Sequence, residues 1–96
     1  MKAALKRKWV AALRSGKYKQ GTDCGLHDPK TKEYCCLGVL ARCANGRNFA
    51  GYSFFPDRIA DQVGISHPQQ RFLAHKNDFD GWSFKRIADW IERHTL

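Results

Sequence analysis

The sequence predicts one α+β domain over residues 1–96, mostly helical, with three to four helices around a buried central helix and a small β-hairpin. Apolar residues recur at helical spacing near both ends of the chain, and a short apolar run lies in the middle. A turn containing Pro29 separates two short stretches of strand character. With 96 residues, of which 43% are hydrophobic, the chain has room for one core and no second domain.

The N-terminal element is predicted to be an amphipathic basic helix over residues 2–15. Ser15-Gly16 ends it, because glycine readily adopts the left-handed conformation that follows a helix. The apolar face has the helical spacing i, i+4, i+7, i+8 and consists of Leu5, Trp9, Ala12 and Leu13.

The middle of the chain is predicted to form the hairpin and the buried helix. Thr22–Leu26 and Lys32–Tyr34 flank a turn at residues 27–31 and should pair as strands. The apolar run over residues 35–44 ends at Asn45-Gly46, and its length favours a helix over a strand. Gly38 within this run indicates close packing against another element.

Two further helices are expected in the second half. Pro56 opens the first, which ends at Gly64. Ser83 is a natural N-cap for the last helix, whose buried stripe includes Ile87 and Ile91. We expect the first and last helices to pack around the central helix of residues 36–43.

Positive charge is concentrated at the N-terminus. The formal net charge is +8, and seven Lys and Arg residues precede the first acid, Asp23. A localised positive field attracts phosphate backbones, anionic lipid or an acidic protein surface, and the alternative is a solvated helix face. Tyr18 lies between two lysines, where its ring could stack on a base. The candidate partner-binding residues are Lys2, Lys6, Arg7, Lys8, Arg14, Lys17, Tyr18 and Lys19.

Export and membrane insertion are not indicated. No apolar run reaches the roughly 18 residues of a membrane span. A secretory signal would need about 7–15 apolar residues near the start, where Lys6-Arg7-Lys8 stands instead. We therefore expect a cytoplasmic protein with reduced thiols. The oligomeric state is left open.

Four residues are weak candidate ligands for a structural zinc ion. Cys24-x2-His27 has the spacing of a ligand pair, whereas Cys36 and Cys43 are separated by six residues, wider than such pairs usually are. Free cysteine more often behaves as a small buried hydrophobe. We expect no cofactor, with zinc as the alternative.

Catalysis is not expected, and no catalytic residue is assigned. No local spacing brings a nucleophile, a base and an orienting group together. Cys35 or Cys36 lies near a helix N-terminus, which can lower a thiol pKa. A redox or enzymatic role for these thiols is therefore kept as an alternative to a buried, inert pair.

A helix-turn-helix over residues 56–75 is a weak structural candidate. Gly64 and Ile65 suit the turn, but Gln70 falls where an apolar side chain should point inward. A short helix followed by a loop is the favoured alternative. If the motif forms, the base-reading candidates are Gln69, Gln70 and Arg71.

Three segments resemble a family of small uncharacterised proteins encoded by tailed bacteriophages and prophages. They are Trp9-x3-Leu13-Arg14-Ser15-Gly16-Lys17-Tyr18-x-Gln20-Gly21, Tyr34-Cys35-Cys36-Leu37-Gly38-Val39-Leu40, and Asn77-Asp78 with Ser83-Phe84-x2-Ile87-Ala88-Asp89-x-Ile91-Glu92. The resemblance implies a bacterial host cytoplasm and an accessory role. It brings no established activity and no functional residues.

These observations predict a small non-enzymatic binding protein whose basic N-terminal helix contacts nucleic acid or a nucleoprotein complex. Besides the enzymatic or redox role of the thiols, two alternatives remain. One is an anti-defence inhibitor, of the anti-CRISPR kind, that acts on a host protein complex by direct contact. The other is a helix-turn-helix-like DNA-binding regulator.

Overall fold

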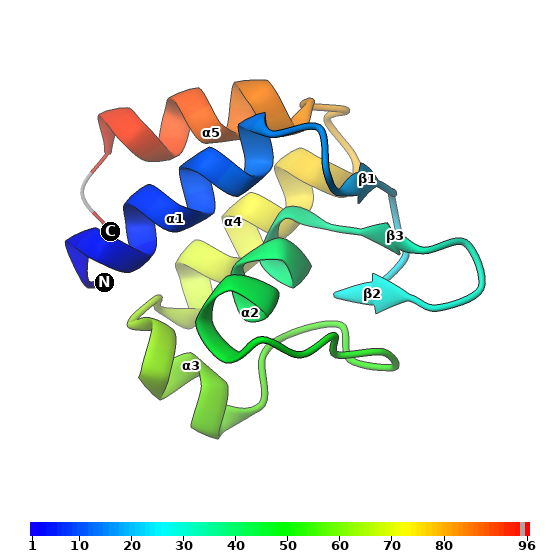
Figure 1. Ribbon diagram of the computed structural model, residues 1–96, viewed down its shortest axis with the longest axis horizontal. Coiled ribbons are helices and arrows are strands. Elements are labelled where there is room, and N and C mark those ends of the chain that lie inside the picture. The colour runs from blue at the N-terminus through cyan, green and yellow to red at the C-terminus, as the bar shows by residue number, and fades with distance from the viewer. Residues whose placement is uncertain (95) are drawn as a thin grey trace.

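The computed structural model describes residues 1–94 and 96, and these residues form five helices and a three-stranded sheet (Figure 1). The mostly helical α+β class is therefore confirmed. One helix more is present than the three to four expected. The helices are α1 (Ala3–Arg14), α2 (Cys36–Asn45), α3 (Asp57–Val63), α4 (His67–Asp78) and α5 (Phe84–Arg93), and the strands are β1 (Lys19–Gln20), β2 (His27–Asp28) and β3 (Glu33–Tyr34).

The predicted helix ends are confirmed at several positions. Gly46 and Gly64 cap α2 and α3 in the left-handed conformation, with φ of 73° and 68°. The Ser83 hydroxyl accepts a hydrogen bond from the Arg86 backbone N–H at 3.2 Å and so caps α5. At the end of α1, Gly16 has φ of 75°. Local capping chemistry therefore decides where these helices stop.

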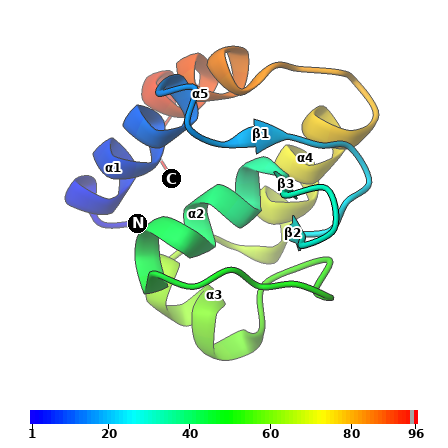
Figure 2. The same cartoon turned by 45° about the vertical axis from the view of Figure 1, so that its right-hand side comes forward.

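The helices enclose one core. α1 and α5 run side by side in opposite directions, and the two termini lie at the same end of the molecule (Figures 1 and 2). α1 also packs on α2, α2 on α4, and α4 on α5, so α5 reaches the central helix less directly than expected. The largest fully buried side chains include Trp9, Leu26, Leu37, Leu40, Leu73, Ile87 and Ile91.

The sheet lies at the end of the molecule opposite the termini (Figures 1 and 2). Its strand order is β1-β3-β2, with β2 antiparallel and β1 parallel to β3. The hairpin is thus present, but its first strand falls at His27–Asp28 rather than at residues 22–26. The backbone of Leu26 instead turns onto α2 and the loop at Tyr52, whose carbonyl accepts from the Leu26 N–H at 2.8 Å.

Asn77 and Gln20 connect the sheet to the helices. Asn77 is fully buried, and its amide donates to the Gly21 carbonyl at 2.9 Å while its Oδ1 accepts from Gln20 at 2.9 Å and from the Cys36 N–H at 3.3 Å. Gln20 also accepts from the Phe84 N–H at 3.0 Å. These bonds fix β1 between the start of α2 and the start of α5.

No helix in the described part of the chain is both long enough and apolar enough to cross a membrane.

Candidate functional site

The cations of the N-terminal segment differ in what they contact. Lys2, Arg7, Lys8, Lys17 and Lys19 are exposed, and no ion pair within residues 1–94 and 96 includes them. They form the unneutralised part of the predicted basic surface.

Two predicted residues of the same set contact α5 instead. Arg14 pairs with Asp89 at 2.7 Å and with Glu92 at 3.0 Å. Its hydrogen bonds lower the pKa of both carboxyls below their ordinary values. Lys6 is half-buried, and its ammonium donates to the His94 carbonyl. Arg14 therefore holds α1 against α5, and its charge is largely balanced there.

A surface groove of about 480 Å³ runs between α1 and the end of α2. Three cations line it and no acid does, so its field is positive. Arg42 reaches it from α2, where its guanidinium donates to the Gly46 carbonyl. We call it the α1–α2 groove, and it is lined by Lys8, Ala11, Ala12, Ser15, Lys17, Tyr18, Arg42, Cys43 and Gly46.

Arg42 was not predicted as a binding residue. It lies within an apolar run that indicates a core helix, and only the packing of α2 on α1 brings it beside Lys8 and Lys17. The signal in the sequence was its position as the one charged residue of that run, and its side chain is exposed in the structure.

Tyr18 and Trp9 are both tied to other parts of the fold. The Tyr18 ring is half-buried and packs edge-on against Tyr34, with 5.1 Å between centroids. Only part of this ring is therefore open to a partner. Trp9 is fully buried and donates from Nε1 to the Cys36 carbonyl at 2.9 Å, which confirms its expected place in the core.

The cysteines are free thiols held in packed surroundings. Burial raises the pKa of Cys35 to about 12 and that of Cys24 to about 11, and it raises the pKa of Cys36 as well. Cys35 does cap α2, accepting from the Gly38 N–H at 3.4 Å. The hypothesis that a helix N-terminus lowers the pKa of these thiols is nevertheless wrong, because desolvation dominates.

The four candidate zinc ligands are held by separate contacts. Cys36 donates to the Leu73 carbonyl at 3.7 Å and Cys43 to the Lys8 carbonyl at 4.0 Å. His27 is 8% exposed and packs on the ring of Tyr34. Outside the undescribed position 95, no group of three or more His, Cys, Asp or Glu residues is placed to hold a metal ion.

α3 and α4 form two helices joined by a short connection, so the favoured short helix followed by a loop is wrong. The base-reading assignments nevertheless fail in part. Gln70 is 2% exposed and accepts from the Phe55 N–H at 3.4 Å, which leaves it inside the protein. The Gln69 side chain closes a capping box with Ser66. Arg71 alone of the three extends freely from the surface.

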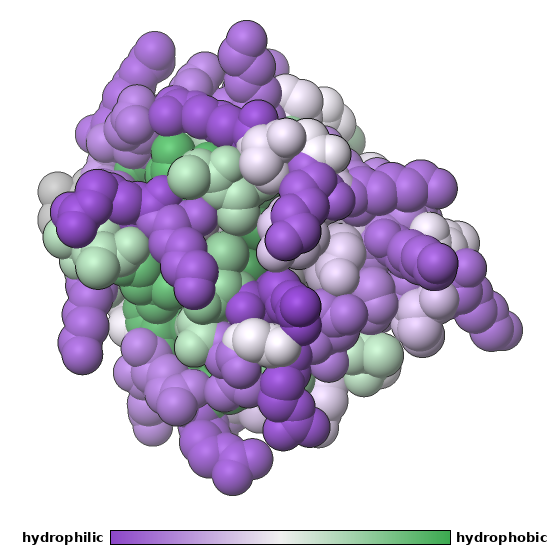
Figure 3. Space-filling view, in the orientation of Figure 1, coloured by the Kyte–Doolittle hydropathy of each residue, from purple (hydrophilic) through white to green (hydrophobic). Residues whose placement is uncertain are grey.

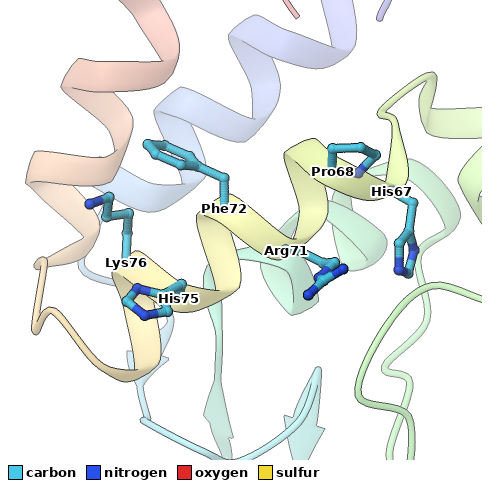
Figure 4. A pocket seen from close by; sticks show the side chains of 6 residues that line it. All are labelled: His67, Pro68, Arg71, Phe72, His75 and Lys76. Atoms are coloured by element: carbon cyan, nitrogen blue, oxygen red, sulfur yellow. The ribbon is translucent and has the colours of Figure 1, made fainter.

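Arg71 lines a second groove, of about 470 Å³, along the outer side of α4 (Figure 4). Phe72 and Lys76 extend from α4 on the side of α5, while His67 and Arg71 extend from the other side. No acid lines this groove, whose residues are His67, Pro68, Arg71, Phe72, His75 and Lys76. Only Arg71 among them was a sequence-based candidate.

Residues 1–48 match a family model described as a domain of unknown function (DUF8296), and this match spans half of the chain. The chain belongs to the DUF8296 family. No curated protein and no solved structure matches it.

The DUF8296 segment contains α1, all three strands and α2. Every residue that lines the α1–α2 groove lies inside it, whereas the groove along α4 lies outside it. The three groove cations therefore belong to the part of the molecule that defines the family.

Proposed function

We propose that this protein is a non-enzymatic binding protein that holds nucleic acid by its phosphate backbone in the α1–α2 groove. The observation that carries the proposal is the meeting of Lys8, Lys17 and Arg42 around a groove without an acid. Like charges brought together repel one another, and an anionic partner relieves that repulsion. A nucleic acid supplies several phosphates in succession, which can contact the cations along a groove together.

The surroundings of the groove favour an extended partner. Further exposed cations lie on the same segment of the chain, with Lys2 just before α1, Arg7 within α1 and Lys19 in β1. Contacts of this kind position a nucleic acid without reading its sequence. The burial of Gln70 and the capping role of Gln69 weigh against a regulator that reads bases with α4.

The setting of the proposal is the cytoplasm of a bacterial host. Its support is the likeness of the three sequence segments to small phage and prophage proteins, together with four free cysteines, of which Cys35 and Cys36 are buried.

A second candidate function is direct contact with a host protein, as in an inhibitor of a defence complex. It is favoured by a groove of about 360 Å³ in which Ala3, Val10 and Ala11 lie among basic side chains of α1, and which Glu92 of α5, the ion-pair partner of Arg14, also lines. Figure 3 displays apolar surface over this part of the molecule, bordered by long hydrophilic side chains. Such a groove suits an acidic amphipathic helix.

The salt dependence of nucleic-acid binding distinguishes the proposed function from the second candidate function. Fluorescence anisotropy with a labelled 20-nucleotide strand, measured at several salt concentrations, should give a log–log slope of several units in the wild-type protein. Replacing Lys8, Lys17 and Arg42 by Gln should reduce the magnitude of this slope by about 2, at roughly 0.7 per lost contact with a single strand.

The matched control removes the same charge elsewhere. Lys30→Gln, Arg58→Gln and Lys85→Gln alter three exposed cations outside the groove. They should leave the slope within about 0.5 of the wild-type value, because no phosphate contact is lost. Equal slopes in the groove and control variants, or no binding at about 50 mM salt, would falsify the proposal.

A further inference from the structure

A continuous series of aromatic and cationic side chains joins α4 to α5. Lys76 lies 5.1 Å from the ring of Phe72 and 5.1 Å from that of Trp82, and Arg86 lies 4.3 Å from the same Trp82 ring. Phe72 packs against Trp90 at 4.9 Å. Trp90 in turn stacks on His94 at 4.0 Å with the ring planes 15° apart. We call Phe72, Lys76, Trp82, Arg86, Trp90 and His94 the aromatic ladder.

The aromatic ladder lies at the border of the core, against which Trp82 and Trp90 pack. The inward side of α5 is already filled by Phe84, Ile87, Ala88 and Ile91, all buried. Phe72 is 38% exposed, and Trp82 and Trp90 are half-buried. Close by, Phe79 packs on His75 at 5.2 Å and is 77% exposed. Rings that remain in water in a small domain contribute less to folding than buried ones and are available to a partner.

The charge around the aromatic ladder is positive on balance. Arg71 lines the groove along α4, and Arg86 and Arg93 line a second groove beside Trp82 and Trp90. None of these three arginines takes part in an ion pair within the described residues. The two nearby acids are already paired, Asp80 with Lys76 at 2.8 Å and Asp89 with Arg14 at 2.7 Å. A partner that fits this surface has planar rings and carries negative charge.

We propose that the aromatic ladder stacks unpaired bases, so that the nucleic acid bound by this protein is single-stranded. This inference rests on the proposed function and specifies its substrate. A duplex presents its phosphates to a surface but keeps its base faces stacked inside. A single strand offers both, and aromatic side chains with nearby cations are the usual platform for it.

The aromatic ladder also meets the basic surface of α1. Its last ring belongs to His94, whose carbonyl accepts from the Lys6 ammonium of α1. α1 and α5 lie side by side, so one strand can contact cations on α1 and rings on α5. The phosphate contacts would then come from the family segment, and the base contacts from the remainder of the chain.

The test compares three probes of equal charge with the full chain: a 20-nucleotide oligothymidine, an abasic strand of the same length, and a duplex hairpin with the same number of phosphates. Oligothymidine should bind about tenfold more tightly than either of the others. Equal affinities for oligothymidine and the abasic strand would overturn the inference.

Variants then place the stacking on the aromatic ladder. Trp90→Leu with Phe72→Leu should weaken oligothymidine binding about tenfold and leave abasic binding and the salt slope unchanged. Phe72→Leu alone, at the more exposed ring, should weaken it about threefold and keeps the test valid if the double variant unfolds. Tyr52→Leu, at a ring 49% exposed in another part of the molecule, is the matched control. Wild-type affinity in the ladder variants overturns the inference.

Failure of the inference is distinguishable from failure of the proposed function. If all three probes bind equally and the groove variant loses salt dependence, nucleic-acid binding stands and base stacking falls. If no probe binds at low salt, the proposed function falls and the inference with it. Ladder-dependent binding of an acidic Glu–Tyr copolymer in preference to oligothymidine overturns the inference in favour of a protein partner.

Discussion

The backbone of Gly38 lies directly against the carbonyl of Leu26. A Cβ built on Gly38 would stand 1.6 Å from the Leu26 oxygen, far inside any contact that atoms tolerate. This approach presses the turn before β2 onto α2 and brings the sheet to the buried helix. Only glycine, which has no Cβ, allows the two backbone segments to come this close.

Gly38→Ala should therefore destabilise the protein by about 3 kcal/mol or more, because a backbone segment has to move. Gly46→Ala is the matched control: its Cβ would meet nothing within 4 Å, and only the left-handed φ of 73° opposes it. That cost is about 1–2 kcal/mol. Urea denaturation measures both. Equal losses would contradict the close contact.

Asn77→Ala should cost about 3 kcal/mol, because it leaves the Gly21 carbonyl and the Cys36 N–H buried without their partner. Asn48→Ala removes an exposed amide that accepts from the Tyr34 hydroxyl and should cost about 0.5 kcal/mol. Thermal or urea unfolding of both variants provides the comparison. A loss below about 1 kcal/mol for Asn77→Ala would be incompatible with its central position.

The Arg14 ion pairs predict a pH-dependent stability. The pKa values of Asp89 and Glu92 lie below their ordinary values of 3.8 and 4.5 in the folded state. Their contribution is therefore present above about pH 5 and is lost as pH falls through the lowered folded-state values.

Arg14→Gln should lower the melting temperature at pH 7, and the difference from wild type should shrink towards pH 3. Arg71→Gln, at an exposed cation that pairs with no acid among residues 1–94 and 96, should show no such convergence. A constant difference between pH 7 and pH 3 for Arg14→Gln would show that the ion pairs do not act in this way.

The thiols of Cys35 and Cys36 should not react with alkylating reagents in the folded protein. Because burial raises the pKa of Cys35 to about 12 and raises that of Cys36 as well, little thiolate exists at pH 7. Iodoacetamide followed by mass spectrometry should modify neither residue in the native state and all four cysteines in urea. Rapid native labelling of Cys35 would revive the redox alternative.

The parts of the fold with local signals could be predicted from the sequence. α1, α2 and α5 have apolar stripes and caps within a few residues of each other, and Gly38 stands alone in an apolar run. α4 has a local capping signal in Ser66 and Gln69 but no apolar stripe. Its inward side contains Gln70, Leu73 and Asn77, and the two amides are satisfied by residues distant in sequence.

Of the three groove cations, only the two in the N-terminal segment could be predicted from the sequence. Lys8 and Lys17 follow from the charge of the N-terminal segment, but Arg42 joins them through tertiary packing. A different contact, the packing of α1 on α5, neutralises Arg14, whose acidic partners lie 75 and 78 residues further along the chain. The aromatic ladder combines residues of α4 and α5 with Trp82 and His94 outside them, so a pattern along one helix does not predict it.

The most direct test of the central claim is amide chemical-shift mapping with a 12-nucleotide oligothymidine. If the strand lies in the α1–α2 groove, the largest shifts should cluster at Lys8, Lys17 and Arg42, with a second group on the aromatic ladder. Thymidine nucleoside, which has no phosphate, should leave the amide shifts of the groove residues unchanged. Shifts confined to α3 and the loop before it, or no shifts at low salt, would contradict the account.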